Sequence, residues 1–141
     1  MKDISQLTDL EKIKYIIQGY MKEYLFTCHE YSVFANENEQ TIEVKIQKNE
    51  TESAFLLLRL GVSKKNEEIY LYNIFLPIED RGNGFGFGLI NVLFSFAGSI
   101  SFQLVLHSMT ESFYDKMLSR GAMETFQEDS LVVTDETDLG S

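Results

Sequence analysis

The chain has 141 residues, of which 44% are hydrophobic and 13% aromatic, and its formal net charge is −10. This length and composition exclude a disordered chain and predict one domain over residues 1–141. Only 12 lysines and arginines stand against 22 acidic residues, which excludes nucleic acid as the main partner. A single cysteine excludes an intrachain disulfide. With no signal-peptide core and no apolar run long enough for a bilayer, we expect a cytoplasmic protein without a membrane partner.

The N-terminal segment is predicted to be a helix. Thr8 and Glu11 have the spacing of a capping box, whose side chains satisfy the free N–H groups at a helix start. Apolar residues then recur at helical spacing: Leu10, Ile13, Ile17, Tyr20, Met21 and Tyr24. We expect this face to pack in the core of the domain. The alternative is that it forms a homodimer contact. Residues 27–40 lose the periodicity, and 36–39 are expected to form a solvated loop.

Three strands are predicted next. Residues 41–48 alternate apolar and polar side chains, as a strand with one buried face does. Residues 54–62 are almost continuously apolar, and residues 68–76 are rich in isoleucine, tyrosine and phenylalanine. Polar turns at 48–51 and 63–66 separate these strands. Because the turns are short, the strands are expected to form antiparallel hairpins.

The second half of the chain is predicted to alternate helices and strands. Residues 87–97 are apolar almost all round, which indicates a buried helix, and residues 100–107 follow as a fourth strand. Ser108 and Glu111 have capping-box spacing and open a helix that runs to Arg120. Gly121 is placed to end that helix.

A last strand within residues 123–134 is clearest at 131–133, and residues 135–141 are expected to be a frayed acidic tail. The strand–helix–strand step after residue 76 requires one parallel pair. We therefore predict an α/β (α+β) domain: a mixed, mostly antiparallel central sheet with helices on both faces.

A glycine-rich turn, residues 81–86, joins the third strand to the next helix. The first N–H groups of a helix have no partners within it and carry partial positive charge. Glycines let the backbone approach a ligand closely, and Arg81 adds a charge-assisted contact. The turn is therefore predicted to bind a phosphate group. The alternative is that the glycines only allow the helix to pack closely on the sheet.

Two common phosphate-binding motifs do not fit this turn. A P-loop needs a Gly-Lys-Ser/Thr ending, and no lysine occurs between Arg81 and Lys116. The dinucleotide fingerprint needs a third glycine at position 87 or 89, where Phe87 and Leu89 stand.

Arg81, Gly84 and Gly86 instead match the signature Arg/Gln-x-x-Gly-x-Gly/Ala of the GNAT superfamily of acyl-CoA N-acyltransferases. Residues 112–118 resemble the family's Phe-Tyr helix, and Gly121 with the alanine after it resembles the small-residue end of that helix. The resemblance covers residues 68–122. The sequence departs from the family at Ser108, which takes the cofactor-binding position where many members carry an asparagine, and in the longer distance from Tyr114 to Gly121.

The resemblance implies that acetyl-CoA binds where the strands 68–76 and 100–107 splay apart. Main-chain groups of Phe75 and Leu76 would contact the pantetheine arm and the thioester, as in β-augmentation. The diphosphate would lie against the backbone N–H groups of five consecutive residues: Gly82, Asn83, Gly84, Phe85 and Gly86.

The resemblance also implies direct acetyl transfer to a primary amine through a tetrahedral intermediate, with Tyr114 giving a proton to the leaving thiolate. Core packing is the alternative role of Tyr114. Tyr72 and Asn73 could hold a water that takes the amine proton, or Glu68 could take it directly, although a solvated strand end explains Glu68 more simply. The acceptor is a small-molecule or protein amine that the sequence does not identify.

Other readings of the sequence are weaker. His29 and His107 have no metal-ligand spacing with the acidic residues, so we expect no metal. Cys28 beside His29 does not make a nucleophile and base pair, because adjacent residues rarely have that geometry. The second hypothesis is a non-catalytic acyl-CoA-binding or protein-interaction module. A third is another nucleotide-phosphate binder.

Overall fold

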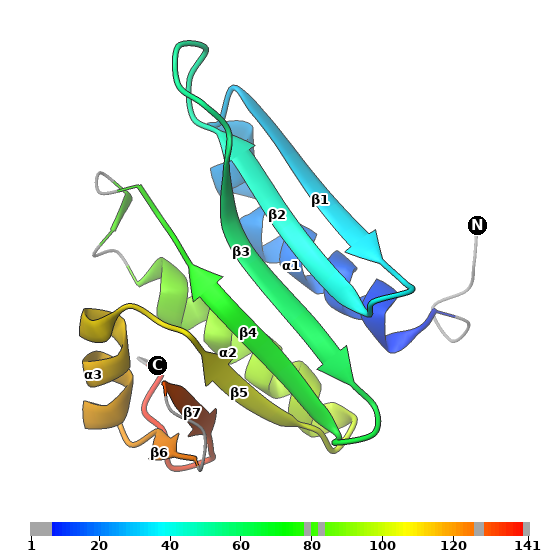
Figure 1. The fold of residues 1–141 in the computed structure, drawn as a ribbon, viewed down its shortest axis with the longest axis vertical. Helices are drawn as coiled ribbons and strands as arrows, with labels where there is room; N and C mark the ends of the chain where they lie inside the picture. Colours follow the sequence, from blue (N-terminus) through cyan, green and yellow to red (C-terminus); the bar gives the residue numbers. More distant parts are fainter. Residues whose placement is uncertain (1–6, 78–79, 82–83, 126–128, 140–141) are drawn as a thin grey trace.

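The computed structural model describes residues 7–77, 80–81, 84–125 and 129–139 (Figure 1). In chain order the elements are α1 (Asp9–Phe26), β1 (Glu30–Asn36), β2 (Thr41–Gln47), β3 (Phe55–Ser63), β4 (Glu68–Ile74), α2 (Phe85–Ser99), β5 (Gln103–His107), α3 (Glu111–Ser119), β6 (Met123–Glu124) and β7 (Ser130–Val133).

All seven strands belong to one sheet, in the order β1-β2-β3-β4-β5-β7-β6. β4 and β5 pair in parallel, and the other neighbours pair antiparallel. The predicted mixed, mostly antiparallel sheet is therefore confirmed. The parallel pair forms because α2 carries the chain back to the end of the sheet at which β4 begins, so that β5 runs in the same direction as β4.

The two long helices, α1 and α2, lie side by side on one face of the sheet (Figure 1). Leu104 and Leu106 of β5 belong to the core under this face, together with Leu89 and Leu93 of α2. The prediction placed helices on both faces. On the opposite face of β2, β3 and β4 no helix lies among the described ranges, and the side chains of that face are exposed, as at Arg59, or half-buried, as at Tyr72.

The first helix begins as its sequence predicts. The Glu11 N–H donates to Thr8 Oγ1 at 3.1 Å, and the Thr8 N–H donates to Glu11 Oε1 at 3.2 Å, which completes the capping box. Ile13, Ile17 and Met21 are fully buried. The predicted use of this face in the core is confirmed. None of the helices in the described ranges combines the length and the apolar character that crossing a bilayer requires.

The segment expected to be irregular, residues 27–40, contains the strand β1, so that part of the prediction is wrong. Residues 37–40 form the turn that leads from β1 to β2. Only Val33 and Ala35 of β1 pack on the core, whereas Tyr31 and Phe34 are exposed. An edge strand with so few buried side chains shows little alternation in its sequence.

The C-terminal third differs from the prediction in three details. Thr110, rather than Ser108, caps α3, because its side chain accepts from the Phe113 N–H, while Ser108 has a left-handed φ of 55°. The expected last strand is two strands, β6 and β7. Residues 135–139 pack on the domain rather than extending from it: Thr137 is buried, and the Asp138 N–H donates to the Arg120 carbonyl at 2.8 Å.

Candidate anion-binding cleft

The site begins where the parallel strands part. The β4–β5 ladder ends at the pair formed by Tyr72 and His107. Just beyond this pair, the step from Tyr72 to Ile74 on β4 faces a single step from Arg59 to Leu58 on β3, so β4 contains a bulge. A bulge bends its strand and increases the local twist. β4 therefore turns away from β5, and the space between the strands opens.

A cleft of about 530 Å³ lies at this fork. Three segments line it: the end of β4, the first turn of α2, and one side of α3. Its lining residues are Ile74, Phe75, Leu76, Arg81, Gly84, Phe85, Gly86, Phe87, Thr110, Ser112, Phe113, Lys116, Ser119 and Arg120.

The N-terminus of α2 opens onto the cleft. Gly84 is the N-cap residue, has a φ of 83°, and receives no side-chain capping bond. Within the helix, the Gly88 N–H donates to the Gly84 carbonyl at 2.9 Å. The N–H groups of Gly86 and Phe87 precede that bond, so the helix itself offers them no acceptor. Together with the macrodipole, such groups favour an anion at this end of the helix.

The side-chain charges of the cleft are all positive. Arg81 lies before the glycines, and Lys116 and Arg120 lie one turn apart on α3. Within the described part of the chain, no aspartate or glutamate lines the cleft. In a protein with a net charge of −10, this local excess of positive charge indicates a site for an anionic ligand.

Aromatic stacking holds α3 against α2. The rings of Phe87 and Phe113 stack with centroids 5.6 Å apart. The Arg120 guanidinium lies 4.2 Å over the Phe87 ring, and Arg120 also reaches Asp138, with Nη1 at 3.9 Å from Oδ2. These contacts fix the position of Arg120 at the cleft wall.

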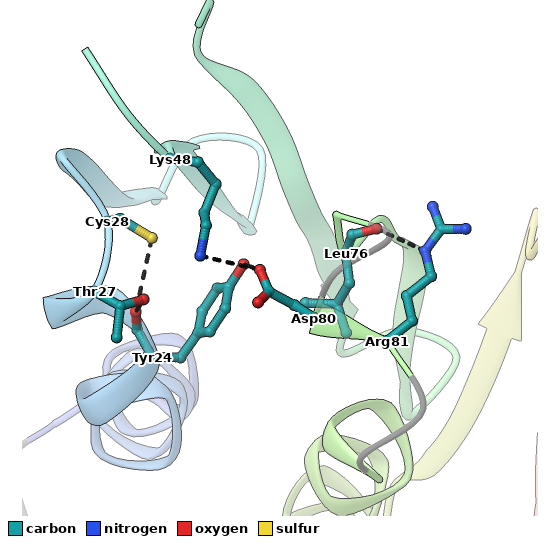
Figure 2. A network of polar contacts seen from close by, with 7 residues as sticks. All are labelled: Tyr24, Thr27, Cys28, Lys48, Leu76, Asp80 and Arg81. Carbon is teal, nitrogen blue, oxygen red and sulfur yellow. Dashed lines mark hydrogen bonds and ion pairs between the residues drawn. The ribbon is translucent and has the colours of Figure 1, made fainter. Parts of the chain in front are cut away.

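The first helix braces the turn from the other side, as Figure 2 shows. The Tyr24 hydroxyl donates to Asp80 Oδ2 at 2.8 Å, and Lys48 Nζ lies 3.1 Å from the same oxygen. The neighbouring Arg81 donates from Nε to the Leu76 carbonyl at 2.8 Å. One turn earlier on α1, the Tyr20 hydroxyl donates to the Phe85 carbonyl at 2.8 Å. Both ends of the glycine turn are therefore tied to α1.

The thiol beside this network is not activated. Cys28 Sγ donates to the Tyr24 carbonyl at 3.7 Å. Burial raises the pKa of the Cys28 thiol, and the negative charge of Asp80 adds to this, although Lys48 and a hydrogen bond to Thr27 act in the opposite direction. A raised pKa keeps the thiol protonated, which does not suit a nucleophile.

Most of the predicted cofactor-binding residues lie together in the structure. The cleft lining includes the following ones: Phe75, Leu76, Arg81, Gly84, Phe85 and Gly86. Gly82 and Asn83 lie outside the described residues. Ser108 is exposed, does not line the cleft, and donates its N–H to the Asp129 carbonyl at 3.1 Å.

The main-chain groups expected to meet the pantetheine arm are partly occupied. The Phe75 N–H donates to the Leu57 carbonyl at 2.7 Å, and the Leu76 carbonyl accepts from Arg81. The Phe75 carbonyl and the Leu76 N–H have no hydrogen bond with any described residue. An extended ligand would therefore pair with the latter two groups, and the predicted contact at this edge stays a prediction.

The predicted catalytic residues do not lie together. Tyr114 is half-buried on the core side of α3 and does not line the cleft. Burial raises its pKa, with smaller contributions from Glu124, Asp129 and Asp115. Glu68 begins β4, at the end away from the cleft. The six steps along the strand from Glu68 to Ile74 span about 20 Å, which is too far for direct proton transfer.

Tyr72 does lie at the fork, but its side chain is on the face of the sheet opposite α2. Its ring contacts His107 edge-on, with centroids 5.4 Å apart, and the Arg59 guanidinium lies 5.7 Å over it. The side chain of Asn73 is outside the description. The water-holding role predicted for these two residues stays a prediction.

The contribution of α3 to the wall of the cleft was not predicted from the sequence. The spacing of Lys116 and Arg120 places both on one side of a helix, which is a readable signal. That this side faces the glycine turn follows only from the fold. The place of His107 at the fork was not predictable either, since the sequence shows only a strand over residues 100–107.

No family model matches the chain, and the search of curated proteins returns no match either. In the ranges that the structure describes, no three side chains of histidine, cysteine, aspartate or glutamate form a metal-binding group. The site is therefore characterised by its own chemistry: a cleft at the fork of two parallel strands, with a helix N-terminus and three cationic side chains in its walls.

Proposed function

We propose that this chain is an N-acetyltransferase of the GNAT type, which moves an acetyl group from acetyl-CoA to a primary amine. One observation carries the proposal: the cleft at the β4–β5 fork combines the α2 N-terminus with Arg81, Lys116 and Arg120, and no described carboxylate lines it. Coenzyme A is an extended thiol whose phosphates carry several negative charges, so this distribution of charge suits it.

The walls divide the work of binding between them. The N–H groups of Gly86 and Phe87 would hold the diphosphate at the helix end, and Lys116 and Arg120 would pair with phosphate oxygens. The Leu76 N–H and the Phe75 carbonyl would pair with the amides of the pantetheine arm. The parallel pairing of β4 and β5 near the centre of the sheet, beside the cleft, supports the resemblance over residues 68–122.

Acetyl-CoA supplies an acyl thioester, whose carbonyl carbon is open to attack by a neutral amine. In the transfer a C–N bond forms and the C–S bond breaks, the amine loses one proton and the thiol gains one. A main-chain N–H at the fork, such as that of Leu76, would stabilise the negative charge that develops on the carbonyl oxygen. The acceptor amine would enter at the uncovered face of the sheet.

Calorimetric titration of the protein with acetyl-CoA tests binding. We expect measurable affinity that weakens with rising salt, because phosphate contacts dominate. Lys116→Ala and Arg120→Ala should each weaken binding, by about 1.5–3 kcal/mol for a charge-assisted contact. Lys65→Ala, in an exposed turn away from the cleft, is the matched control and should bind like the wild type. Equal affinity in all four proteins would contradict the proposed site.

Release of free thiol from acetyl-CoA tests the reaction, with spermidine, free lysine and a peptide with an unblocked N-terminus as acceptors. We expect amine-dependent release with at least one class of acceptor. Release at the same rate without an amine would indicate a thioesterase instead.

A non-catalytic acyl-CoA-binding module is the second candidate. The positions of Tyr114 and Glu68 favour it, because neither residue predicted to move a proton lines the cleft. Binding of acetyl-CoA without thiol release from any acceptor would support this module. If the protein binds ATP or ADP and not acetyl-CoA, the site belongs to another nucleotide-phosphate binder.

A further inference from the structure

His107 occupies the last rung of the parallel ladder, at the point where β4 and β5 part. Its neighbours Leu104 and Leu106 point into the core under α2. By strand alternation, His107 therefore points to the face of the sheet opposite α2. Its side chain is half-buried there, beside Tyr72 of β4. The imidazole is thus at the fork, across the sheet from the anion-binding cleft.

A buried hydroxyl orients this imidazole. Ser130 begins β7, is 1% exposed, and pairs with His107 in the β5–β7 ladder. Its Oγ forms a hydrogen bond with His107 Nδ1. The Tyr72 ring meets the imidazole edge-on, at an interplanar angle of 86°. The hydrogen bond to Ser130 and the contact with Tyr72 therefore restrict the rotation of the His107 ring.

The second ring nitrogen has a different environment. Nε2 of His107 forms no hydrogen bond with any described residue. If Nδ1 carries the proton and donates it to Ser130, Nε2 presents an available lone pair on the face opposite α2. This arrangement of an oriented imidazole with one available nitrogen is what a general base requires.

We infer that His107 is the base that takes the proton of the acceptor amine, and that Ser130 is its positioning residue. This inference rests on the proposed function. The amine nitrogen forms a bond to the thioester carbonyl carbon, and its proton passes to Nε2. The C–S bond breaks, and the departing sulfur takes up one proton, either directly from the imidazolium or from a solvent molecule to which the imidazolium returns one. The imidazole ends in its original state, so atoms and charges balance.

The other candidates serve this role less well. Glu68 lies at the opposite end of β4. The pKa of Tyr114 is raised by burial, which keeps its hydroxyl protonated and unsuited to act as a base at neutral pH.

Several charged or titratable groups lie on the elements around the imidazole. Tyr70 and Tyr72 lie on β4, and Arg59 of β3 lies over the Tyr72 ring. Asp129 precedes Ser130, and Glu124 of β6 lies beyond β7. A change in any of these charges would alter the environment of the imidazole, so the test replaces only His107 and Ser130.

The kinetic test compares His107→Gln with the wild type in the acetyl-CoA and amine assay. We expect the affinity for acetyl-CoA in calorimetry to be unchanged and the rate of amine-dependent thiol release to fall by about 10²–10⁴-fold. Added imidazole should restore part of the rate to His107→Ala. His29→Gln is the matched control, since His29 is exposed and precedes β1, the edge strand three places from β4 in the sheet, and it should react at the wild-type rate.

Nitrogen-15 NMR of the imidazoles tests the orientation without an acceptor. The protein has only two histidines, so the His107→Gln spectrum assigns the signals. We expect the neutral His107 ring to carry its proton on Nδ1, and Ser130→Ala to shift it toward the Nε2–H form with a slower transfer rate.

The outcomes separate the two proposals. If the wild type binds acetyl-CoA but acetylates none of the amines, the proposed transferase function fails and the role of His107 fails with it. If the wild type is active and His107→Gln is equally active, or if the neutral ring carries its proton on Nε2, only the inference about His107 is overturned.

Discussion

Gly88 lies one turn into α2, against the side chain of Tyr20. A Cβ at this position would come 3.0 Å from Tyr20 Cζ and closer still to its hydroxyl. The hydroxyl would have to leave the Phe85 carbonyl, to which it donates. Because this strain outweighs the helix propensity that alanine gains, we expect Gly88→Ala to lose about 1 kcal/mol of stability. Urea denaturation measures the change.

Gly19 on α1 provides the matched control. It is exposed, and a Cβ there would meet no atom within 4 Å. Gly19→Ala should therefore stabilise the protein by about 0.5–1 kcal/mol. If both alanines stabilise the protein equally, Tyr20 does not brace the turn in the way described here.

Gly84 is the second glycine whose backbone matters. Its φ of 83° is strained for any side chain, at a cost of about 1–3 kcal/mol, although a Cβ there has open space around it. We expect Gly84→Val to weaken acetyl-CoA binding sharply, because the side chain would change the path of the helix N-terminus. Calorimetry measures this, and Gly98→Val, in open space near the end of α2, should bind normally. Wild-type affinity in Gly84→Val would contradict the role of this turn.

At the scale of elements, α1 acts as a brace for the turn between β4 and α2. The Tyr24 hydroxyl donates to the Asp80 carboxylate, which also holds Lys48 (Figure 2). Tyr24→Phe removes a hydrogen bond to a charged group and should cost about 1.5–3 kcal/mol of stability. Thermal or urea denaturation checks this. Tyr15→Phe, on the exposed side of α1, should have no effect, and equal losses in both variants would contradict the bracing role.

The elements differ in how much of them the sequence reveals. α1 has a capping box and a continuous apolar face, and both are present in the structure. β1 was missed because only Val33 and Ala35 pack inward, so its pattern lacks a buried face. The start of α3 was displaced because Ser108 and Thr110 both suit a cap. Ser108 has a left-handed backbone conformation and Thr110 is the cap. The spacing of the residues does not predict this difference.

The cleft shows the same division. The glycine turn was predictable because its residues are consecutive and their chemistry is local. The positive wall from Lys116 and Arg120 was not, since it depends on how α3 packs against Phe87. That neither Tyr114 nor Glu68 lines the cleft could not be predicted for a related reason. A helix side or a strand end acquires its direction only when the whole sheet is assembled.

At the scale of the whole molecule, several acidic groups hold their protons more tightly in the fold. Burial raises the pKa values of Cys28, Tyr20, Tyr70 and Tyr114 above their ordinary values of 9.0 for the thiol and 10.0 for the phenols. Above about pH 9 the folded protein therefore binds more protons than the unfolded chain, so the free energy of unfolding falls as pH rises.

Urea midpoints between about pH 8 and about pH 10.5 measure this decline. Tyr20→Phe removes one of the groups and should make the decline less steep, whatever its effect on stability near neutral pH. Stability that stays constant or rises over this range would contradict the description of these sites.

A crystal structure with bound coenzyme A tests the central claim most directly. The account predicts that the diphosphate lies against the main-chain N–H groups at the start of α2, within reach of Lys116 and Arg120, with the thiol directed to the fork beside the last rung of β4 and β5. Coenzyme A bound elsewhere on the molecule, with the cleft filled by side chains or solvent, would contradict it.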